Sequence, residues 1–408
     1  MRNLRNTSSI WSDRNKRLLF SSGALISLPA GYAQVVLPVY LKLIGISAVL
    51  VGVLTTISLL VMSILLVPFG ILSDRYGRRP FLLAGVFLTA VSWAIMVATT
   101  EFTVIAISRA IAGIGNALTS APFNAALADI TSDEDRIKVF SMSSFVSQIA
   151  STGGALISGM PEALQAWFGL SLASSYIPLF LLACLFSIVA AGFLFPFKES
   201  ISGRRESAKV RFQFTKGILV FAFTRGLIGF GAGFVIPLFS LWFYLRFGVG
   251  GAVLGPLFAI SNITLAFSYL ISFRLARAIG SVNSLVLCQA LAIVLLVAMP
   301  ESTDYLLVSA LYVARNFLMN MSQPIETSFI MSIVRPDERA SASALAGAAS
   351  SISRAVSPSL GGYFMSSVSL SVPFYMTAVL YAASTAIFFV SFRDVSVSGK
   401  AKGSSLPW

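Results

Sequence analysis

The sequence GILSDRYGRRP, residues 70–80, separates two long apolar runs, residues 49–69 and residues 81–98. A helix rises 1.5 Å per residue, so a run of about 20 apolar residues is long enough to cross the hydrocarbon core of a bilayer. Three of the eleven residues in this stretch are arginines. Because basic residues between spans stay in the cytoplasm, this charged hairpin predicts the orientation of both flanking helices.

The composition extends this pattern to the whole chain. Of the 408 residues, 56% are hydrophobic and 11% are charged, and the mean hydropathy is +0.85. A soluble protein carries about 25% charged residues, so a large soluble α-protein would lack the polar surface that it needs. The net charge of +13 does not indicate nucleic-acid binding, because the basic residues lie between spans rather than in a separate basic domain. We therefore expect an all-α integral membrane protein in contact with the lipid bilayer.

Several kinds of chemistry are excluded by what the sequence lacks. The chain contains no histidine, which excludes histidine metal sites and Ser-His triads. Cys184 and Cys288 both lie within apolar runs and predict no disulfide framework. The first apolar run is too long for a signal peptide, and no P-loop is present. We expect no metal, no cofactor and no enzymatic activity.

Apolar runs separated by polar breaks predict twelve transmembrane helices. The expected spans are residues 18–41, 48–72, 81–99, 103–126, 139–160, 175–197, 216–245, 252–276, 282–300, 304–333, 340–366 and 371–392. The predicted domains are a cytoplasmic N-terminal arm (1–17), an N-terminal six-helix bundle (18–197), a central cytoplasmic loop (198–215), a C-terminal six-helix bundle (216–392) and a cytoplasmic tail (393–408).

The distribution of lysine and arginine supports this topology. With both termini in the cytoplasm, the outer loops contain only Lys42 and Arg246 and four arginines lie inside spans, so the other basic residues fall on the inner side. This asymmetry is what the positive-inside rule predicts, and one missed span would destroy it. We expect a multi-pass protein of the plasma membrane with both termini in the cytoplasm.

The sequence also contains an internal repeat. Three pairs of matching positions are each separated by 203 residues, close to half of the chain length. The pairs are Gly77 with Gly280, Glu134-Asp135-Arg136 with Asp337-Glu338-Arg339, and Gly159 with Gly362. Each match is weak alone, but a common offset indicates two six-helix halves related by duplication. Transporters built from two such halves bind substrate near the bilayer midplane.

These features together resemble the major facilitator superfamily. Its most specific signature is the hairpin pattern Gly70-x-x-x-Asp74-x-x-Gly77-Arg78-Arg79, and Arg109-x-x-x-Gly113-x-Gly115 matches a second, weaker pattern. The resemblance covers the whole chain and implies two pseudo-symmetric six-helix bundles that transport a small-molecule substrate by alternating access, without ATP. It also implies that the hairpin holds the two halves together as a cytoplasmic gate. The gate residues would be Gly70, Asp74, Gly77, Arg78 and Arg79; the alternative is an ordinary basic loop that only sets topology.

Two departures from the family pattern bear on the substrate. Residues 151–154 lack the Gly-Pro pair that is typical of drug/proton antiporters, and Arg277 replaces the acid of the second hairpin. These differences weigh against a drug antiporter.

Five ionisable residues are embedded in the predicted spans, away from the span ends: Arg109, Arg225, Arg315, Arg354 and Glu326. A charge at the bilayer centre costs about 3 kcal/mol or more unless it is paired or hydrated, so we expect these side chains to face the bundle interior. Arg225 and Arg315 lie about 15 Å from the ends of spans seven and ten, which line the cavity in the family. They are the candidates for binding an anionic group, because a guanidinium donates two parallel hydrogen bonds to a carboxylate or phosphate. The alternative is that either one only stabilises packing.

Glu326 is the single acid within the spans, and two roles remain open for it. Burial would make it a proton carrier, whereas an arginine partner would make it part of a structural ion pair, with Arg354 as the candidate. The surplus of arginines favours the pair. Arg109 matches the span-four arginine of the family, which implies a structural or proton-linked role. Four further polar residues are candidates for substrate binding or for simple interhelical hydrogen bonds: Tyr32, Gln34, Asn316 and Asn320.

The sequence thus predicts a secondary transporter, expected to be monomeric. Four arginines against one glutamate favour an organic anion or a solute with an anionic group, with H⁺ as the coupling ion through Glu326 if there is one. A multidrug/proton antiporter that exports hydrophobic compounds is the alternative, favoured by 33 phenylalanines. A non-transporting membrane sensor on the same scaffold would need a soluble domain that the sequence does not show.

Overall fold

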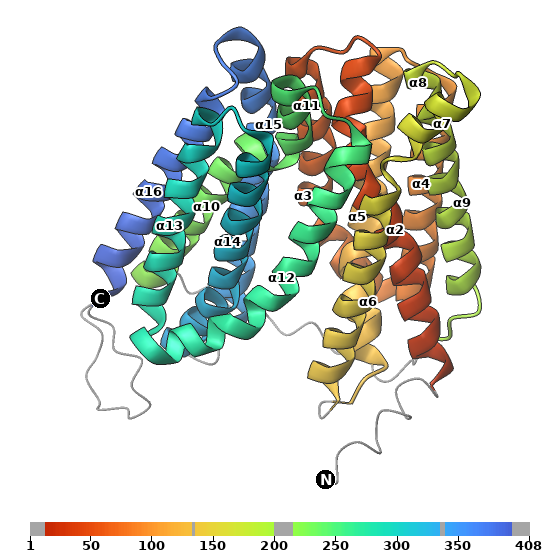
Figure 1. Ribbon diagram of the computed structural model, residues 1–408. Helices are drawn as coiled ribbons and strands as arrows, with labels where there is room; N and C mark the ends of the chain where they lie inside the picture. Colours follow the sequence, from red (N-terminus) through yellow and green to blue (C-terminus); the bar gives the residue numbers. More distant parts are fainter. Residues whose placement is uncertain (1–12, 133–134, 200–214, 335–338, 394–408) are drawn as a thin grey trace, which may run out of the picture. The chain divides into compact units, whose positions relative to one another are not determined.

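The structure is a computed structural model that describes residues 13–132, 135–199, 215–334 and 339–393. These residues are almost entirely helical, and no strand occurs among them. Most of the predicted N-terminal arm, central loop and tail lies outside the described residues, as do Glu134, Asp337 and Glu338 of the repeat. The predicted all-α membrane fold is confirmed for the part that is described (Figure 1).

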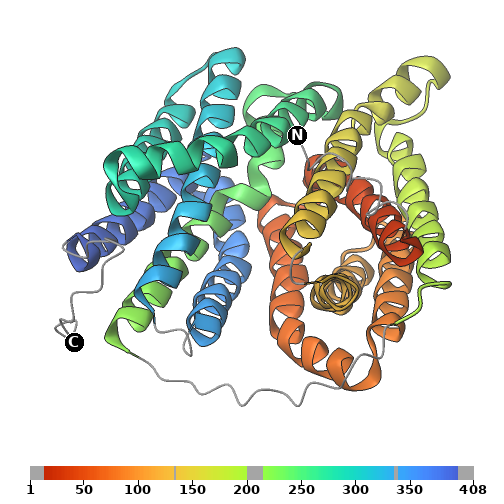
Figure 2. The ribbon, with the colours of Figure 1, turned by 90° about the horizontal axis from the view of Figure 1, so that it is seen from below.

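The chain divides into two compact units, Met1–Glu206 with Phe243–Ala259 (unit 1), and Ser207–Trp242 with Ile260–Trp408 (unit 2). Among the described residues, unit 1 begins with eight helices: α2 (Arg14–Leu43), α3 (Ala48–Tyr76), α4 (Arg78–Ala98), α5 (Phe102–Asp129), α6 (Arg136–Ile157), α7 (Met160–Phe168), α8 (Leu172–Ser175) and α9 (Ile177–Leu194). In this unit α2 packs on α6 and α9, and α4 packs on α5 and α9. Figure 2 shows α5 end-on, with α3 and α4 beside it.

Unit 2 contains α10 and the last four helices of the chain. The bounds of the remaining elements are α10 (Lys216–Val235), η1 (Ile236–Leu238), α11 (Phe239–Phe247), α12 (Gly251–Ile279), α13 (Ser281–Glu301), α14 (Tyr305–Ile333), α15 (Arg339–Ser367) and α16 (Val372–Phe392). The boundaries between the two units fall within α11 and within α12, so the first part of α12 belongs to unit 1. The predicted boundaries of the two bundles stay a prediction.

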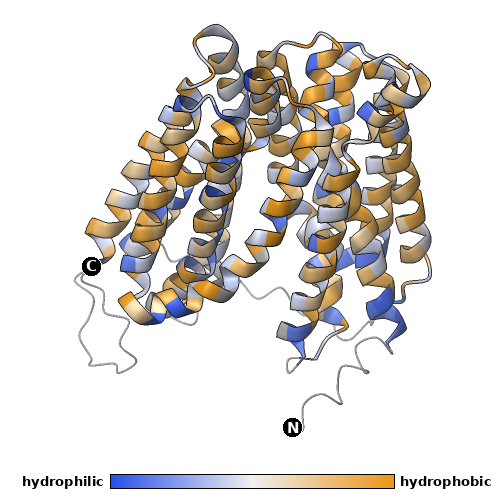
Figure 3. Cartoon of the chain, in the orientation of Figure 1, coloured by the Kyte–Doolittle hydropathy of each residue, from blue (hydrophilic) through white to orange (hydrophobic). Residues whose placement is uncertain are grey.

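Nine helical segments of the described chain are long and apolar enough to cross a membrane. Three further long helices coincide with predicted spans but are more polar: α6, α14 and α15. The seventh predicted span is interrupted at Pro237, where a 3-10 turn joins α10 to α11, because proline cannot donate the helical hydrogen bond. Apolar residues run along all these helices (Figure 3), and many large ones are exposed, such as Val67 and Phe87, as suits contact with lipid.

The internal repeat is confirmed by the helix bounds. α12 begins and ends 203 residues after α3, and α13 begins and ends 203 residues after α4. The same residue type closes both hairpins: Gly77 has φ +101° and Gly280 has φ +83°. Both angles lie in the left-handed region, where a side chain is strained, so glycine is required at each junction.

Candidate functional site

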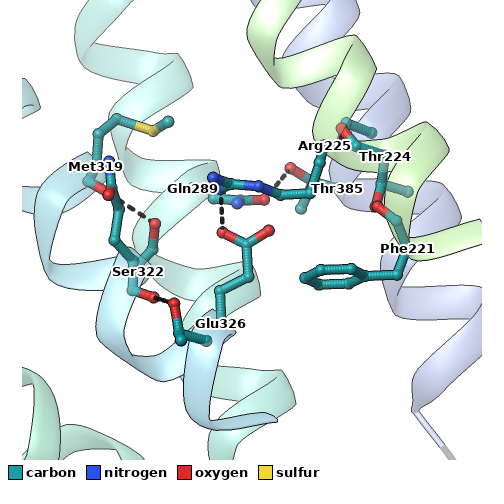
Figure 4. Close-up of polar contacts among 11 residues, drawn as sticks. Phe221, Thr224, Arg225, Gln289, Met319, Ser322, Glu326 and Thr385 are labelled. Atoms are coloured by element: carbon teal, nitrogen blue, oxygen red, sulfur yellow. Dashed lines mark hydrogen bonds and ion pairs between the residues drawn. The ribbon is translucent and has the colours of Figure 1, made fainter. Parts of the chain in front are cut away.

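Unit 2 contains a buried ion pair between α10 and α14. Arg225 Nη1 donates to Glu326 Oε2 at 2.6 Å, and the two side chains point toward one another in Figure 4. The Glu326 side chain is only 5% exposed, whereas that of Arg225 is 25% exposed. The structure therefore pairs Glu326 with Arg225, not with Arg354 as the sequence suggested.

Apolar packing positions this ion pair. Phe221, one turn before Arg225, and Ile325 and Phe329, next to and one turn from Glu326, belong to one hydrophobic cluster in unit 2. These side chains exclude water from one side of the pair, and the attraction between opposite charges is stronger where water is excluded. The pair thus lies at the edge of an apolar core and remains accessible through Arg225.

Arg315 on α14 is almost fully buried, with 2% of the residue exposed. Its Nη1 donates to Asn316 Oδ1 at 3.0 Å and its Nη2 to the Tyr381 hydroxyl at 3.1 Å. The guanidinium also lies 5.7 Å from the ring centroid of Tyr381 and 6.0 Å from that of Phe239, within cation–π range. No carboxylate balances its charge among the contacts that the structure records.

Arg354 on α15 completes a group of three arginines in unit 2. It is close enough to Arg225 and Arg315 to be influenced by their charges. The Nε–H groups of Arg315 and Arg354 are buried and have no hydrogen-bond partner among the described residues. Buried cations without counter-ions are costly in a membrane, so the group has positive charge and free donors available for an anion.

The predicted amide ligands have hydrogen-bond partners within unit 2. Asn316 Nδ2 donates to Ser261 Oγ at 2.9 Å, which joins α14 to α12. Asn320 Nδ2 donates to the Asn316 carbonyl at 2.8 Å, one turn earlier in the same helix. Direct substrate contact by these two residues stays a prediction.

Tyr32 and Gln34, the candidates on α2, differ in their surroundings. Tyr32 is fully buried and its hydroxyl donates to the Leu179 carbonyl on α9 at 2.8 Å, so it holds two helices of unit 1 together. Gln34 is exposed.

The charged hairpin of unit 1 is held by Arg78, which lies at the start of α4 and contacts α3 and α5. Arg78 forms an ion pair with Asp74 on α3 and donates to Ser73 Oγ at 2.9 Å. Its Nε lies 3.3 Å from Asp129 Oδ2 at the end of α5. This network fixes the hairpin within the unit, and its action as a gate stays a prediction.

A second acid also binds the hairpin. The Glu199 carboxylate accepts from the backbone N–H of Arg79 in the first turn of α4, and the Arg79 guanidinium donates to the Phe195 carbonyl. Sequence reasoning missed Glu199 and Asp129. Both lie just beyond the inner end of a predicted span, next to a charged segment, and that position was the available signal.

Close packing near the hairpin does not depend on Gly70. A Cβ added at Gly70 would meet the Ala121 Cβ at 3.6 Å, an ordinary van der Waals distance. At Gly113 an added Cβ would lie 2.5 Å from the Ser58 carbonyl oxygen, so α3 and α5 approach closely there. Close approach between these two helices is therefore found at Gly113 and not at Gly70.

Arg109 is buried on α5 against an aromatic ring. It is 7% exposed, and its guanidinium lies 5.7 Å from the ring centroid of Trp93 on α4. Its Nε and Nη1 have no partner among the residues that the structure describes. Among all the residues that the structure describes, no group of three histidine, cysteine or acidic side chains could hold a metal ion.

The comparisons with known proteins identify the family. The sequence matches the Major Facilitator Superfamily over residues 19–300 and again over residues 221–406, so the chain belongs to this family of membrane transporters. It is 35% identical over 114 residues to the class C tetracycline resistance protein of Escherichia coli, a match that covers 28% of each chain. It is 24% identical over 290 residues to multidrug resistance protein 2 of Bacillus subtilis, covering 66% of this chain and 69% of that protein.

A solved structure shares the fold. A bacterial homologue of the human lysosomal transporter Spinster, in an inward-facing and occupied conformation, aligns with a TM-score of 0.76. The alignment covers 93% of this chain and 96% of that chain at 14% sequence identity. Identity this low shows the fold alone. The chain is a multi-pass transporter of the superfamily, and its substrate is a separate question.

Proposed function

We propose that this transporter moves an organic solute with an anionic group by alternating access, and that the arginines of unit 2 attract that group. The observation that carries the proposal is an imbalance of charge: three arginines lie near one another and, in the part of the chain that the structure describes, only Glu326 opposes them. Arg225 is partly exposed and keeps donors beyond the one that Glu326 uses, so it contacts the anion directly. Arg315 is buried and adds positive potential without contact.

Glu326 gives this site a route to proton coupling. The Glu326 carboxylate accepts a hydrogen bond from the guanidinium that an incoming anion needs. Glu326 and the anion therefore compete for Arg225. Protonation of Glu326 would remove its charge and release Arg225 for the solute. H⁺ and the anion would then bind together. We expect Glu326→Gln to bind the anion without a proton, so that uptake no longer responds to a pH gradient while exchange of anion for anion continues.

The remaining features fit a plasma-membrane protein that works as a monomer. We place both termini in the cytoplasm on the distribution of basic residues, and we assign the Asp74–Arg78 hairpin the role of a cytoplasmic gate.

Uptake of radiolabelled carboxylates into proteoliposomes tests the anion site. The variant Arg225→Met/Glu326→Leu removes both charges and leaves no unpaired carboxylate, so it should fold but lose most carboxylate uptake. Arg225→Lys should keep part of it, because a lysine preserves the charge but not the paired donors. Arg246→Ala, which changes an exposed arginine of α11, should transport normally. Normal carboxylate uptake in both the paired variant and Arg315→Met would refute the proposal.

Export of drugs is the second candidate, supported by the similarity to tetracycline and multidrug resistance proteins. Cells that express the chain would then accumulate less of a lipophilic cation such as ethidium than cells with an empty vector. Ethidium export that survives the Arg225→Met/Glu326→Leu change, without any carboxylate transport by the wild type, would favour this candidate over the first.

A further inference from the structure

Unit 1 contains a polar cavity of about 280 Å³ that is lined by α2, α5 and α6 and by no charged residue. Its lining is dominated by hydroxyl groups, with one amide and one aromatic ring. The polar lining residues are Ser27, Thr119, Ser120, Asn124, Ser143, Ser144 and Ser147. Phe123, Ile26 and Gly23 form the apolar part. Counted at 1.5 Å per residue along the helices, the cavity lies about 10–15 Å from the end of unit 1 where the charged hairpin is found.

The serine hydroxyls of this cavity lack the helix-backbone partners that several other serines of unit 1 have. In membrane helices a serine ordinarily donates to a carbonyl of its own helix, three or four residues earlier. Ser22, Ser73 and Ser187 do so, at 3.0, 2.8 and 2.8 Å. None of the five cavity serines forms a hydrogen bond with another described residue.

Ser143 is the most buried of the five cavity serines. It is 7% exposed, and its hydroxyl has no partner among the described residues. Ser144 is exposed and the other three cavity serines are partly buried, so a molecule that enters the cavity can reach and satisfy these hydroxyls. Only Thr119 in the lining bonds back to its own helix, to the Gly115 carbonyl at 2.7 Å.

We propose that this cavity is a binding site for a neutral, hydroxyl-bearing solute, or for the neutral hydroxylated part of a larger one. A serine hydroxyl both donates and accepts, which matches the hydroxyls of a polyol or sugar ring. A charged ligand is excluded because no lining residue would balance its charge in a low-dielectric site. The ring of Phe123 offers an apolar surface for the C–H face of such a ligand. At this volume, near the lower limit of about 300 Å³ for ligand pockets, a small ligand fits, such as a monosaccharide ring with one short substituent.

This site is independent of the arginines in unit 2 and goes beyond the anion transport proposed above. Its test uses three probes with the purified full-length protein in lipid nanodiscs: myo-inositol, phenyl β-D-glucoside and benzoate. Saturation-transfer NMR and titration calorimetry should detect binding of the first two. Phenyl β-D-glucoside should bind more tightly than myo-inositol, because its phenyl group adds apolar contact with Phe123.

Matched serine variants locate the site. Ser143→Ala/Ser147→Ala should weaken phenyl β-D-glucoside binding about tenfold or more, and Ser147→Phe, which fills the cavity, should abolish it. Ser187→Ala is the control, because Ser187 is equally buried but bonded within its own helix, and it should bind as the wild type does. Failure of both neutral probes to bind the wild type, or equal binding by all three serine variants, would overturn the proposal.

The outcome is separable from that of the anion proposal. Arg225→Met/Glu326→Leu should weaken benzoate binding and leave phenyl β-D-glucoside binding unchanged. If that variant instead removes binding of the neutral probe, the hydroxylated ligand binds in unit 2 and this inference is wrong. If only benzoate fails to bind, the anion proposal falls and the neutral site stands.

Discussion

The ion pair between Arg225 and Glu326 is a residue-scale feature on which the stability of unit 2 depends. Its partners are 2.6 Å apart and Glu326 is nearly buried. Arg225→Met alone would leave a buried carboxylate without a counter-ion, and removal of one partner of a buried pair costs about 3–5 kcal/mol. We therefore expect a clear loss of stability in a thermal unfolding experiment followed by intrinsic tryptophan fluorescence in detergent.

The paired variant separates charge from packing. Arg225→Met/Glu326→Leu removes both charges and should recover most of that loss, because apolar side chains of similar size can replace a buried ion pair at little cost. A double variant that is as unstable as the sum of the two single variants would show that the charges do not interact in the folded protein.

At the residue scale, the sequence predicted that Glu326 forms an ion pair but did not predict that Arg225 is its partner. The surplus of arginines within spans indicated that Glu326 would find one, and it does. Arg225 and Arg354 both lie in the middle of a span, and the choice between them depends on helix rotation, which no local pattern encodes. Tyr32 illustrates the same limit: its hydroxyl bonds a carbonyl 147 residues away, which a single sequence does not reveal.

At the scale of elements, close contact between α2 and α6 depends on glycine. A Cβ added at Gly154 would clash with the backbone of Leu28, whereas one added at the neighbouring Gly153 would meet no atom within 4 Å. We expect Gly154→Ala to destabilise the protein by about 1–3 kcal/mol through overpacking. Gly153→Ala should be neutral or stabilising by up to about 1 kcal/mol, because alanine favours the helix.

The two glycines form a matched pair for measurement. Unfolding temperatures of both alanine variants in the same detergent would check this prediction, and equal values would contradict the packing of α2 on α6. Because the two residues are adjacent in α6, they lie at nearly the same position along the helix axis.

A carboxylate also determines where α12 begins. Glu162 Oε1 on α7 accepts from the Gly251 N–H at 2.5 Å, and Ser158 Oγ donates to the Gly251 carbonyl at 3.1 Å. Because a hydrogen bond to a charged group contributes about 1.5–3 kcal/mol, Glu162→Ala should lower stability by a similar amount. Glu101→Ala is the control: Glu101 precedes α5 without a capping hydrogen bond, so its loss should change stability by less than about 0.5 kcal/mol. Equal unfolding temperatures for the two variants would contradict the capping role.

Helix positions were the part of the fold that the sequence predicted best. Apolar runs and the common offset of 203 residues gave the spans, and the bounds of α3, α4, α12 and α13 repeat that offset. The 3-10 turn at Pro237 was missed because the apolar run continues through it. The hydroxyl-lined cavity was missed for a different reason: serine is common in these helices, and only the structure shows which hydroxyls lack a partner.

For the whole molecule, the distribution of basic residues predicts an orientation that can be measured. Arg246 and Thr303 are predicted to face the outside, and Arg277 the cytoplasm, because lysine and arginine collect on the inner side of membrane proteins. Single cysteines at these positions, in a Cys184→Ser/Cys288→Ser background, would be treated with a membrane-impermeant maleimide in intact cells. Arg246→Cys and Thr303→Cys should react at once, and Arg277→Cys only after permeabilisation. Reaction of Arg277→Cys in intact cells, with protection of the other two, would invert the orientation and place the Asp74–Arg78 hairpin on the outer side.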